Sequence, residues 1–110
     1  EFEDASEQYL KCIELQPNDP VYHWNYAISL ENQCFYYKAE EAYKRAINLD
    51  FNCIDAHINY AHMLENQPTP QYRKALKQYE VILKMPEMIN NTEIMLKCAK
   101  LYDHFGDHEK

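Results

Sequence analysis

A 34-residue internal repeat constrains the fold of this chain more than any other feature of its sequence. Residues 23–33 read HWNYAISLENQ and residues 57–67 read HINYAHMLENQ, which are identical at eight of eleven positions. A second set of matches alternates with these blocks: Ala5, Tyr9 and Cys12; Ala39, Tyr43 and Ala46; and Ala75, Tyr79 and Ile82. Self-similarity at a spacing of about 20–50 residues is typical of architectures in which equivalent units stack on one another.

Each block has apolar residues three and four apart, the spacing of an amphipathic helix, and turns rich in Pro and polar residues separate the blocks. The chain has a single Gly, which also disfavours a sheet rich in hairpins. We therefore expect an all-α fold, with Pro70 at a first helical position and Thr69 as its cap. The expected helices span residues 3–16, 20–33, 36–49, 54–67, 70–84 and 92–105.

The pattern resembles the tetratricopeptide repeat (TPR) family, in which a W-x2-L-G-x2-Y motif in the first helix is paired with A-x3-F in the second. The first-helix matches are Tyr26, Ala27 and Leu30; Tyr60, Ala61 and Leu64; and Cys98, Ala99 and Tyr102. The resemblance implies a single domain, residues 1–110, that forms a right-handed α-solenoid of about six helices. Its parts would be a second helix at 3–16, a repeat at 20–53, a longer repeat at 54–91 and a further first helix at 92–106.

The sequence departs from the family pattern at several positions. His23 and His57 occupy the usual Trp position, Cys34 stands where Gly is expected, and Gly106 falls at an inter-helix turn. The longer repeat has four extra residues, which we expect as two in each of its two turns. Because the chain begins in a second helix and stops after a first helix, we expect a fragment of a longer array whose exposed terminal helices would allow homo-oligomers.

Small residues are expected where paired helices cross, since close approach of two backbones leaves little room for side chains. The candidates are Ala27, Ala39, Ala46, Ala61, Ala75 and Ala99. The opposite faces of the first helices are then free, and in the resembled family these faces line a groove that holds peptides or helices. The predicted partner-binding residues are Trp24, Asn25, Ile28, Asn32, Ile58, Asn59, His62, Asn66, Lys97 and Lys100.

Asn25 and Asn59 occupy the same position in consecutive repeats, and a side-chain amide both donates to and accepts from an extended peptide backbone. The alternative is that Asn is simply common there. Trp24 is either an apolar anchor for the partner or a side chain tucked against a neighbouring helix. The repeated pairs Glu31-Asn32 and Glu65-Asn66 would either select a basic ligand or form a solvated helix face, and the two lysines make the groove mixed in sign.

Composition and motifs exclude several function classes. The formal charge is −7, and residues 1–55 carry 11 acids but only 4 bases, which disfavours nucleic acid or an anionic membrane as a partner. No Gly-rich phosphate loop, nucleophile motif or convincing metal set occurs, so we expect a protein that is not an enzyme and has no cofactor. The four cysteines lack C-x-x-C spacing, and we expect free thiols in a reducing, cytoplasmic setting.

The sequence thus predicts a non-catalytic module that binds a peptide or helix of a partner protein on its concave face. Two alternatives stay open. One is a structural segment that self-associates within a larger assembly, and the other is the repeat arm of an enzyme whose catalytic domain lies elsewhere.

Overall fold

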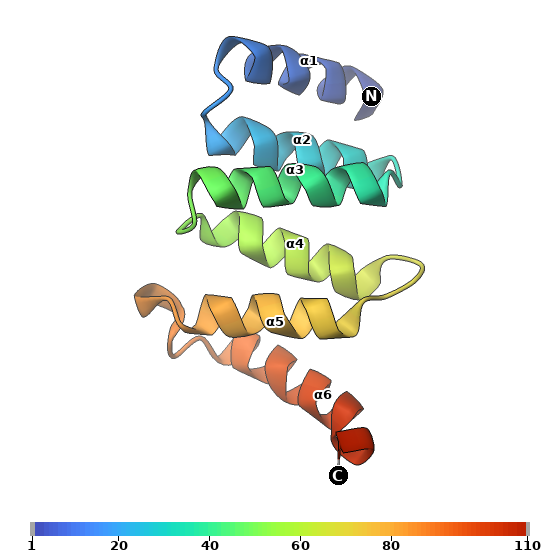
Figure 1. Cartoon of the computed structure of the whole chain (residues 1–110), viewed down its shortest axis with the longest axis vertical. Coiled ribbons are helices and arrows are strands. Elements are labelled where there is room, and N and C mark those ends of the chain that lie inside the picture. Colours follow the sequence, from blue (N-terminus) through green and yellow to red (C-terminus); the bar gives the residue numbers. More distant parts are fainter. Residues whose placement is uncertain (1, 110) are drawn as a thin grey trace. The chain divides into compact units, whose positions relative to one another are not determined.

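The computed structural model describes residues 2–109, with side chains from 5 to 106. It contains helices α1 to α6 and one short 3-10 turn, η1, between α5 and α6 (Figure 1). Within the described residues there is no strand, so the predicted all-α class is confirmed. The bounds are α1 Phe2–Leu15, α2 Pro20–Asn32, α3 Tyr36–Leu49, α4 Ile54–Asn66, α5 Tyr72–Leu83, η1 Pro86–Met88 and α6 Thr92–Glu109.

The chain divides into two compact units, residues 1–59 and 60–110, with the boundary inside α4. In the first unit α2 packs against both α1 and α3, and in the second unit α5 packs against α6. The predicted alanines Ala27, Ala39 and Ala46 are completely buried in the first unit, as are Ala61 and Ala75 in the second. Ala99 is exposed, and that prediction was wrong because no other described helix covers its side of α6.

Helix α2 begins where the sequence predicts. Asp19 precedes it with an extended backbone, and its Oδ1 accepts a hydrogen bond from the Val21 amide at 3.0 Å. Pro20 occupies the first turn, where its missing N–H is not needed.

Helix α2 ends in a Schellman motif. Cys34 has a left-handed φ of 68°, its amide donates to the Glu31 carbonyl at 2.9 Å, and the Phe35 amide donates to the Leu30 carbonyl at 2.9 Å. Cys34 therefore adopts the left-handed backbone conformation in which Gly, the residue of the TPR pattern at this position, is preferred.

Helix α4 cannot end in the same way, because Pro68 stands at the position of Cys34 and has no N–H to donate. The chain instead makes a loop over residues 67–71, and the Gln71 amide donates to the Leu64 carbonyl at 2.7 Å. Helix α5 begins only at Tyr72, with no side-chain cap, so the predicted start at Pro70 with Thr69 as cap was wrong.

The four extra residues of the longer repeat are distributed differently from the prediction. The first turn, 67–71, has two residues more than its counterpart 33–35, as predicted. The second turn, 84–91, has four more than 50–53, and α5 is shorter than α3 by two residues, 12 against 14. The second turn accommodates this length by forming η1 and burying Met85.

Gly106 does not form a turn. Helix α6 continues through it to Glu109, and the glycine has no positive φ. A Cβ at this position would meet nothing within 4 Å, so no steric pressure favours Gly there. The predicted inter-helix turn at Gly106 was therefore wrong.

Candidate partner-binding site

Two kinds of polar contact recur at the repeat spacing and hold neighbouring segments together. The first joins a buried histidine to the turn before its helix. The ring Nε2 of His23 donates to the Pro17 carbonyl at 2.8 Å, and the ring Nε2 of His57 donates to the Phe51 carbonyl at 2.8 Å. Both histidines are buried. Because a carbonyl oxygen only accepts, each of these bonds requires the N–H of the imidazole ring to be on Nε2.

The third first helix lacks this contact. Met95 occupies the equivalent position in α6 and is about half exposed, at 49%. The turn before it is the long one that contains η1. Because no ring nitrogen binds the turn at 84–91, the length of this turn can differ from that of the turn at 50–53.

The second recurring contact joins a first-helix glutamate to a second-helix tyrosine. The Tyr43 hydroxyl donates to Glu31 Oε1 at 2.7 Å, and the Tyr79 hydroxyl donates to Glu65 Oε2 at 3.2 Å. Burial raises the pKa of Glu31, and the bond from Tyr43 partly offsets this shift. Both tyrosines are fully buried, and burial together with the nearby glutamate raises the pKa of each phenol. The glutamates therefore link helices, a role that neither alternative from the sequence anticipated.

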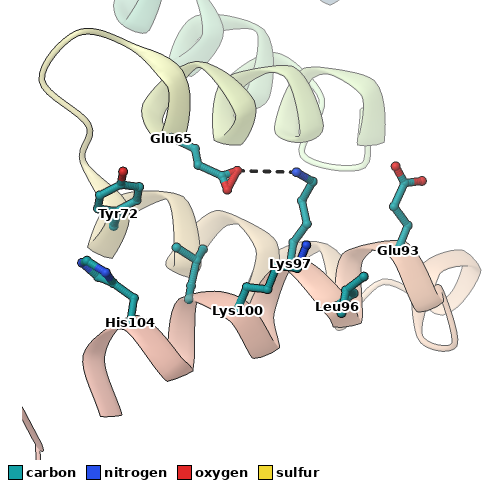
Figure 2. Close-up of a pocket in the computed structure, with 8 residues that line it drawn as sticks. Glu65, Tyr72, Glu93, Leu96, Lys97, Lys100 and His104 are labelled. Carbon is teal, nitrogen blue, oxygen red and sulfur yellow. Dashed lines mark ion pairs between the residues drawn. The ribbon is translucent and has the colours of Figure 1, made fainter. Parts of the chain in front are cut away.

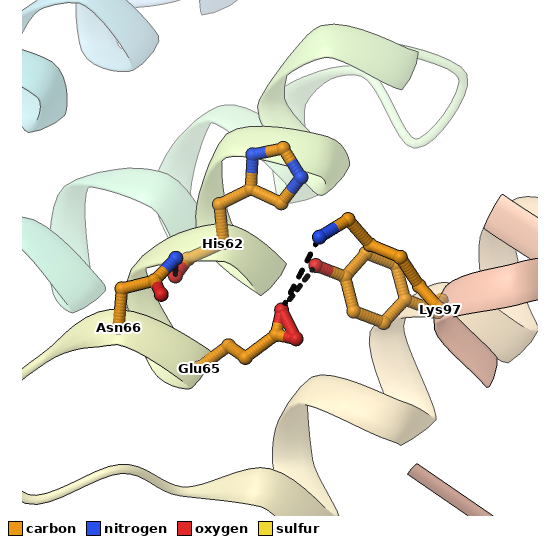
Figure 3. A network of polar contacts seen from close by, with 5 residues as sticks. His62, Glu65, Asn66 and Lys97 are labelled. Carbon is orange, nitrogen blue, oxygen red and sulfur yellow. Dashed lines mark hydrogen bonds and ion pairs between the residues drawn. The ribbon is translucent and has the colours of Figure 1, made fainter. Parts of the chain in front are cut away.

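Glu65 belongs to a wider network in the second unit (Figure 3). The ammonium of Lys97 lies 3.6 Å from Glu65 Oε2 and 5.9 Å from the centre of the Tyr79 ring. The His62 ring lies beside the same tyrosine, with the ring centroids 6.1 Å apart. Burial lowers the pKa of His62 and Lys97 lowers it further, against opposing effects of Glu65 and Glu93. The network brings together predicted residues His62 and Lys97 around a buried phenol.

A pocket of about 300 Å³ opens beside this network in the second unit (Figure 2). Its lining combines charged, aromatic and apolar side chains from α4, α5 and α6: Glu65, Tyr72, Glu93, Leu96, Lys97, Lys100, Leu101 and His104. The Tyr72 and His104 rings contact each other with their centroids 4.8 Å apart, at the opposite end of the pocket from Glu93. Charges of both signs face the same space, and Leu96 and Leu101 add apolar surface to the lining.

The pocket includes Lys97 and Lys100, two of the predicted binding residues, and places them beside residues that the sequence reasoning missed. Tyr72 and Glu93 were not predicted to bind. Tyr72 was missed because the groove was predicted from the free faces of the first helices alone, and Tyr72 lies at the start of α5, a second helix. No local signal in the sequence marks Glu93, since the pocket depends on how three helices pack.

The first unit holds most of the other side chains of the predicted surface. Asn25 and Asn59 are half-buried, as are Ile28 and Ile58. The side-chain amides of both asparagines lack hydrogen-bond partners within the part of the chain that the structure describes. Asn32 is exposed on the same helix as Asn25.

Trp24 and Asn66 differ from the free binding groups that the sequence suggests. Trp24 is half-buried, and its indole Nε1 is buried without a hydrogen-bond partner among the described residues. This edge of the ring is tucked inward. In the second unit, exposed Asn66 donates through Nδ2 to the His62 carbonyl at 2.8 Å, within its own helix.

The described residues contain no cluster of three or more His, Cys, Asp or Glu side chains that could hold a metal ion. All four cysteines are free thiols, as expected. Burial is the main cause that raises the pKa of Cys53 and of Cys98, which keeps these thiols protonated at neutral pH. In residues 2–109, none of the helices combines the length and apolar character needed to cross a bilayer. Comparisons of the chain with protein-family models and with curated proteins found no match.

Proposed function

We propose that this chain is a right-handed repeat module of the TPR type that binds an extended segment of a partner protein without catalysis. The recurring packing residues support the repeat: Ala27 and Leu30 in α2 are buried, and so are Ala61 and Leu64 at the equivalent positions of α4. The His–carbonyl and Tyr–Glu bonds support it further, because each occurs twice at equivalent positions.

One observation carries the binding proposal. The polar side chains that recur in the repeat fall into two groups, and only one group forms hydrogen bonds to other parts of the chain. His23, His57 and Glu31 are bonded to other parts of the chain, whereas the repeated Asn25 and Asn59 are half-buried and their amides lack partners within the described residues. Neither amide is buried away from water, so both are available to a ligand, and a peptide backbone satisfies the donor and the acceptor of such a group.

The pocket in the second unit adds a place for a side chain of the ligand. Lys97 is held by Glu65 at 3.6 Å, and Lys100 is exposed without an ion-pair partner in the described part of the chain. An acidic or carboxylate group would pair with Lys100, while Leu96 offers apolar contact on the same helix. Ligand selection should therefore favour an acidic residue next to an apolar one.

The proposal is tested by panning a random peptide library on the chain and measuring the enriched peptides by calorimetry. The variant Asn25→Ala with Asn59→Ala removes both amides, and at about 0.5–1.5 kcal/mol for each hydrogen bond it should weaken binding roughly 5- to 150-fold. The control Asn48→Ala with Asn90→Ala alters two exposed asparagines outside the predicted surface and should bind as the wild type does. Failure to enrich any peptide, or equal affinity in the two double variants, would refute the proposal.

A further inference from the structure

The two Tyr–Glu pairs of the chain differ in one component, a cation. In the second unit, Glu65 accepts a hydrogen bond from the Tyr79 hydroxyl at 3.2 Å and also pairs with the ammonium of Lys97 at 3.6 Å (Figure 3). The same ammonium lies 5.9 Å from the centre of the Tyr79 ring, so a carboxylate and an aromatic ring both attract one positive charge. We refer to Glu65, Tyr79 and Lys97 as the second-unit triad.

The first unit holds the same carboxylate and phenol without the cation. The Tyr43 hydroxyl donates to Glu31 Oε1 at 2.7 Å. Asn59 in α4 stands where Lys97 stands in α6, two residues before the alanine that the repeat pattern aligns. The Asn59 side chain is neutral, and Glu31 has no ion-pair partner in the part of the chain that the structure describes.

The missing cation is a difference in sequence and does not depend on where the chain begins or ends. Helices α4, α5 and α6 supply the second-unit triad, and the corresponding helices α2, α3 and α4 are all present. Only the residue at one position differs, Asn59 in place of Lys97. No further repeat is therefore needed to build the first-unit pair.

The partial burial of Glu31 increases its attraction for a cation. Burial raises the pKa of Glu31, and the bond from Tyr43 only partly offsets this shift. Water screens a half-buried carboxylate less than an exposed one, so an opposite charge interacts with it more strongly. Oε2 of Glu31 accepts no hydrogen bond from the described residues and is available to a donor. Residues 1–55, with 11 acids and 4 bases, add a long-range attraction for positive charge.

We propose that the Glu31–Tyr43 pair binds a lysine or arginine side chain of the partner segment, at the place that the Lys97 ammonium takes in the second-unit triad. This inference rests on the proposed peptide binding and names one feature of the ligand. The charged end of that side chain pairs with Glu31 Oε2, and the Asn59 amide is left for the peptide backbone. The acidic ligand residue expected at Lys100 is a separate contact in the second unit.

Parallel panning of one random peptide library on the wild type and on Glu31→Gln tests the proposal. Glu31→Gln still accepts the bond from Tyr43, and Trp24 emission verifies that the variant folds. Peptides selected by the wild type should share a Lys or Arg at one position, and peptides selected by Glu31→Gln should lack it. The control Glu41→Gln removes the same charge from an exposed position of α3 and should select the wild-type motif.

The possible outcomes separate this inference from the proposed function. Failure of every form of the chain to enrich a peptide refutes the proposed function and the inference with it. Enriched peptides without a shared basic residue overturn the inference alone, and so does the same basic residue in the peptides selected by Glu31→Gln.

Calorimetry and NMR then test the contact directly with an enriched peptide and its neutral analogue, in which norleucine replaces Lys or citrulline replaces Arg. The analogue should bind the wild type and Glu41→Gln about tenfold more weakly than the parent peptide, but Glu31→Gln less than about twofold more weakly. Because a nearby positive charge favours the ionised form, the pKa of Glu31, followed by its ¹³C carboxyl signal, should fall in the complex with the basic peptide only. Equal losses in all three forms of the chain, or an unchanged pKa of Glu31, would contradict the contact.

Discussion

Removal of the Tyr43 hydroxyl tests whether the repeated Tyr–Glu bond holds the helix pairs together. Tyr43 is fully buried, and its hydroxyl lies 2.7 Å from Glu31 Oε1. A hydrogen bond to a charged group contributes about 1.5–3 kcal/mol, and water can partly replace it at half-buried Glu31. We therefore expect Tyr43→Phe to lower the free energy of unfolding by ~1.5 kcal/mol at pH 7. Urea unfolding followed by the emission of Trp24, the single Trp and a residue of the same unit, measures the loss.

The loss of unfolding free energy caused by Tyr43→Phe should depend on pH, because it depends on the ionisation of Glu31. Burial raises the folded-state pKa of Glu31 above 4.5, so ionisation of Glu31 costs stability as the pH rises through that folded value. The Tyr43 bond lowers the same pKa, and Tyr43→Phe should raise it further. The penalty of the substitution should therefore be largest at pH 7 and should shrink as the pH falls below the normal glutamate range. Glu31→Gln, which still accepts the bond, should remove this dependence.

Tyr37→Phe is the matched control, because Tyr37 lies on the same helix and is 75% exposed. It should change the unfolding free energy by less than about 0.5 kcal/mol at either pH. If Tyr43→Phe is equally mild, or if its penalty is the same at pH 7 and below pH 4, the reasoning on the Glu31 bond is refuted.

Four further substitutions test individual features of the fold by urea unfolding. Cys34→Gly should stabilise by about 0.5–1 kcal/mol, because Gly adopts the left-handed φ without strain, and Cys34→Val should destabilise; equal effects would contradict the turn. His57→Phe keeps a ring but leaves the Phe51 carbonyl without its donor, for an expected loss of about 1–3 kcal/mol; a neutral result would refute the role of the histidine. Ala39→Leu should cost about 1–3 kcal/mol by overpacking, and an unchanged midpoint would contradict its complete burial. Gly106→Ala should stabilise by up to about 1 kcal/mol, whereas destabilisation would indicate a turn.

Sequence periodicity predicted the helices well because the signals are local. Apolar spacing places the helix faces, and Asp19-Pro20 starts α2 at the predicted residue. The end of α4 failed because it depends on one missing donor: Pro68 lacks the N–H that Cys34 supplies, so the chain needs a longer loop. Ala99 failed for a different reason, since local sequence matches Ala61 but burial requires a second helix to cover it.

The candidate site was harder to predict than the fold. Helix periodicity placed Lys97 and Lys100 on one face, and the pocket contains both. It could not place Tyr72, because the contribution of α5 depends on the path of the loop before it. It also assigned Glu65 to a free surface, although the Tyr79 hydroxyl from the next helix reaches its carboxylate at 3.2 Å. Such contacts depend on the packing of helices, which the spacing within one helix does not specify.

The most direct measurement of the central claim follows the side-chain amide signals of asparagine by two-dimensional ¹H–¹⁵N NMR while a library-selected peptide is added. The side chains of Asn25 and Asn59 should shift together and saturate with the calorimetric affinity, whereas those of exposed Asn18 and Asn48 should not move. Stationary signals from Asn25 and Asn59, with shifts confined to other residues, would contradict the account.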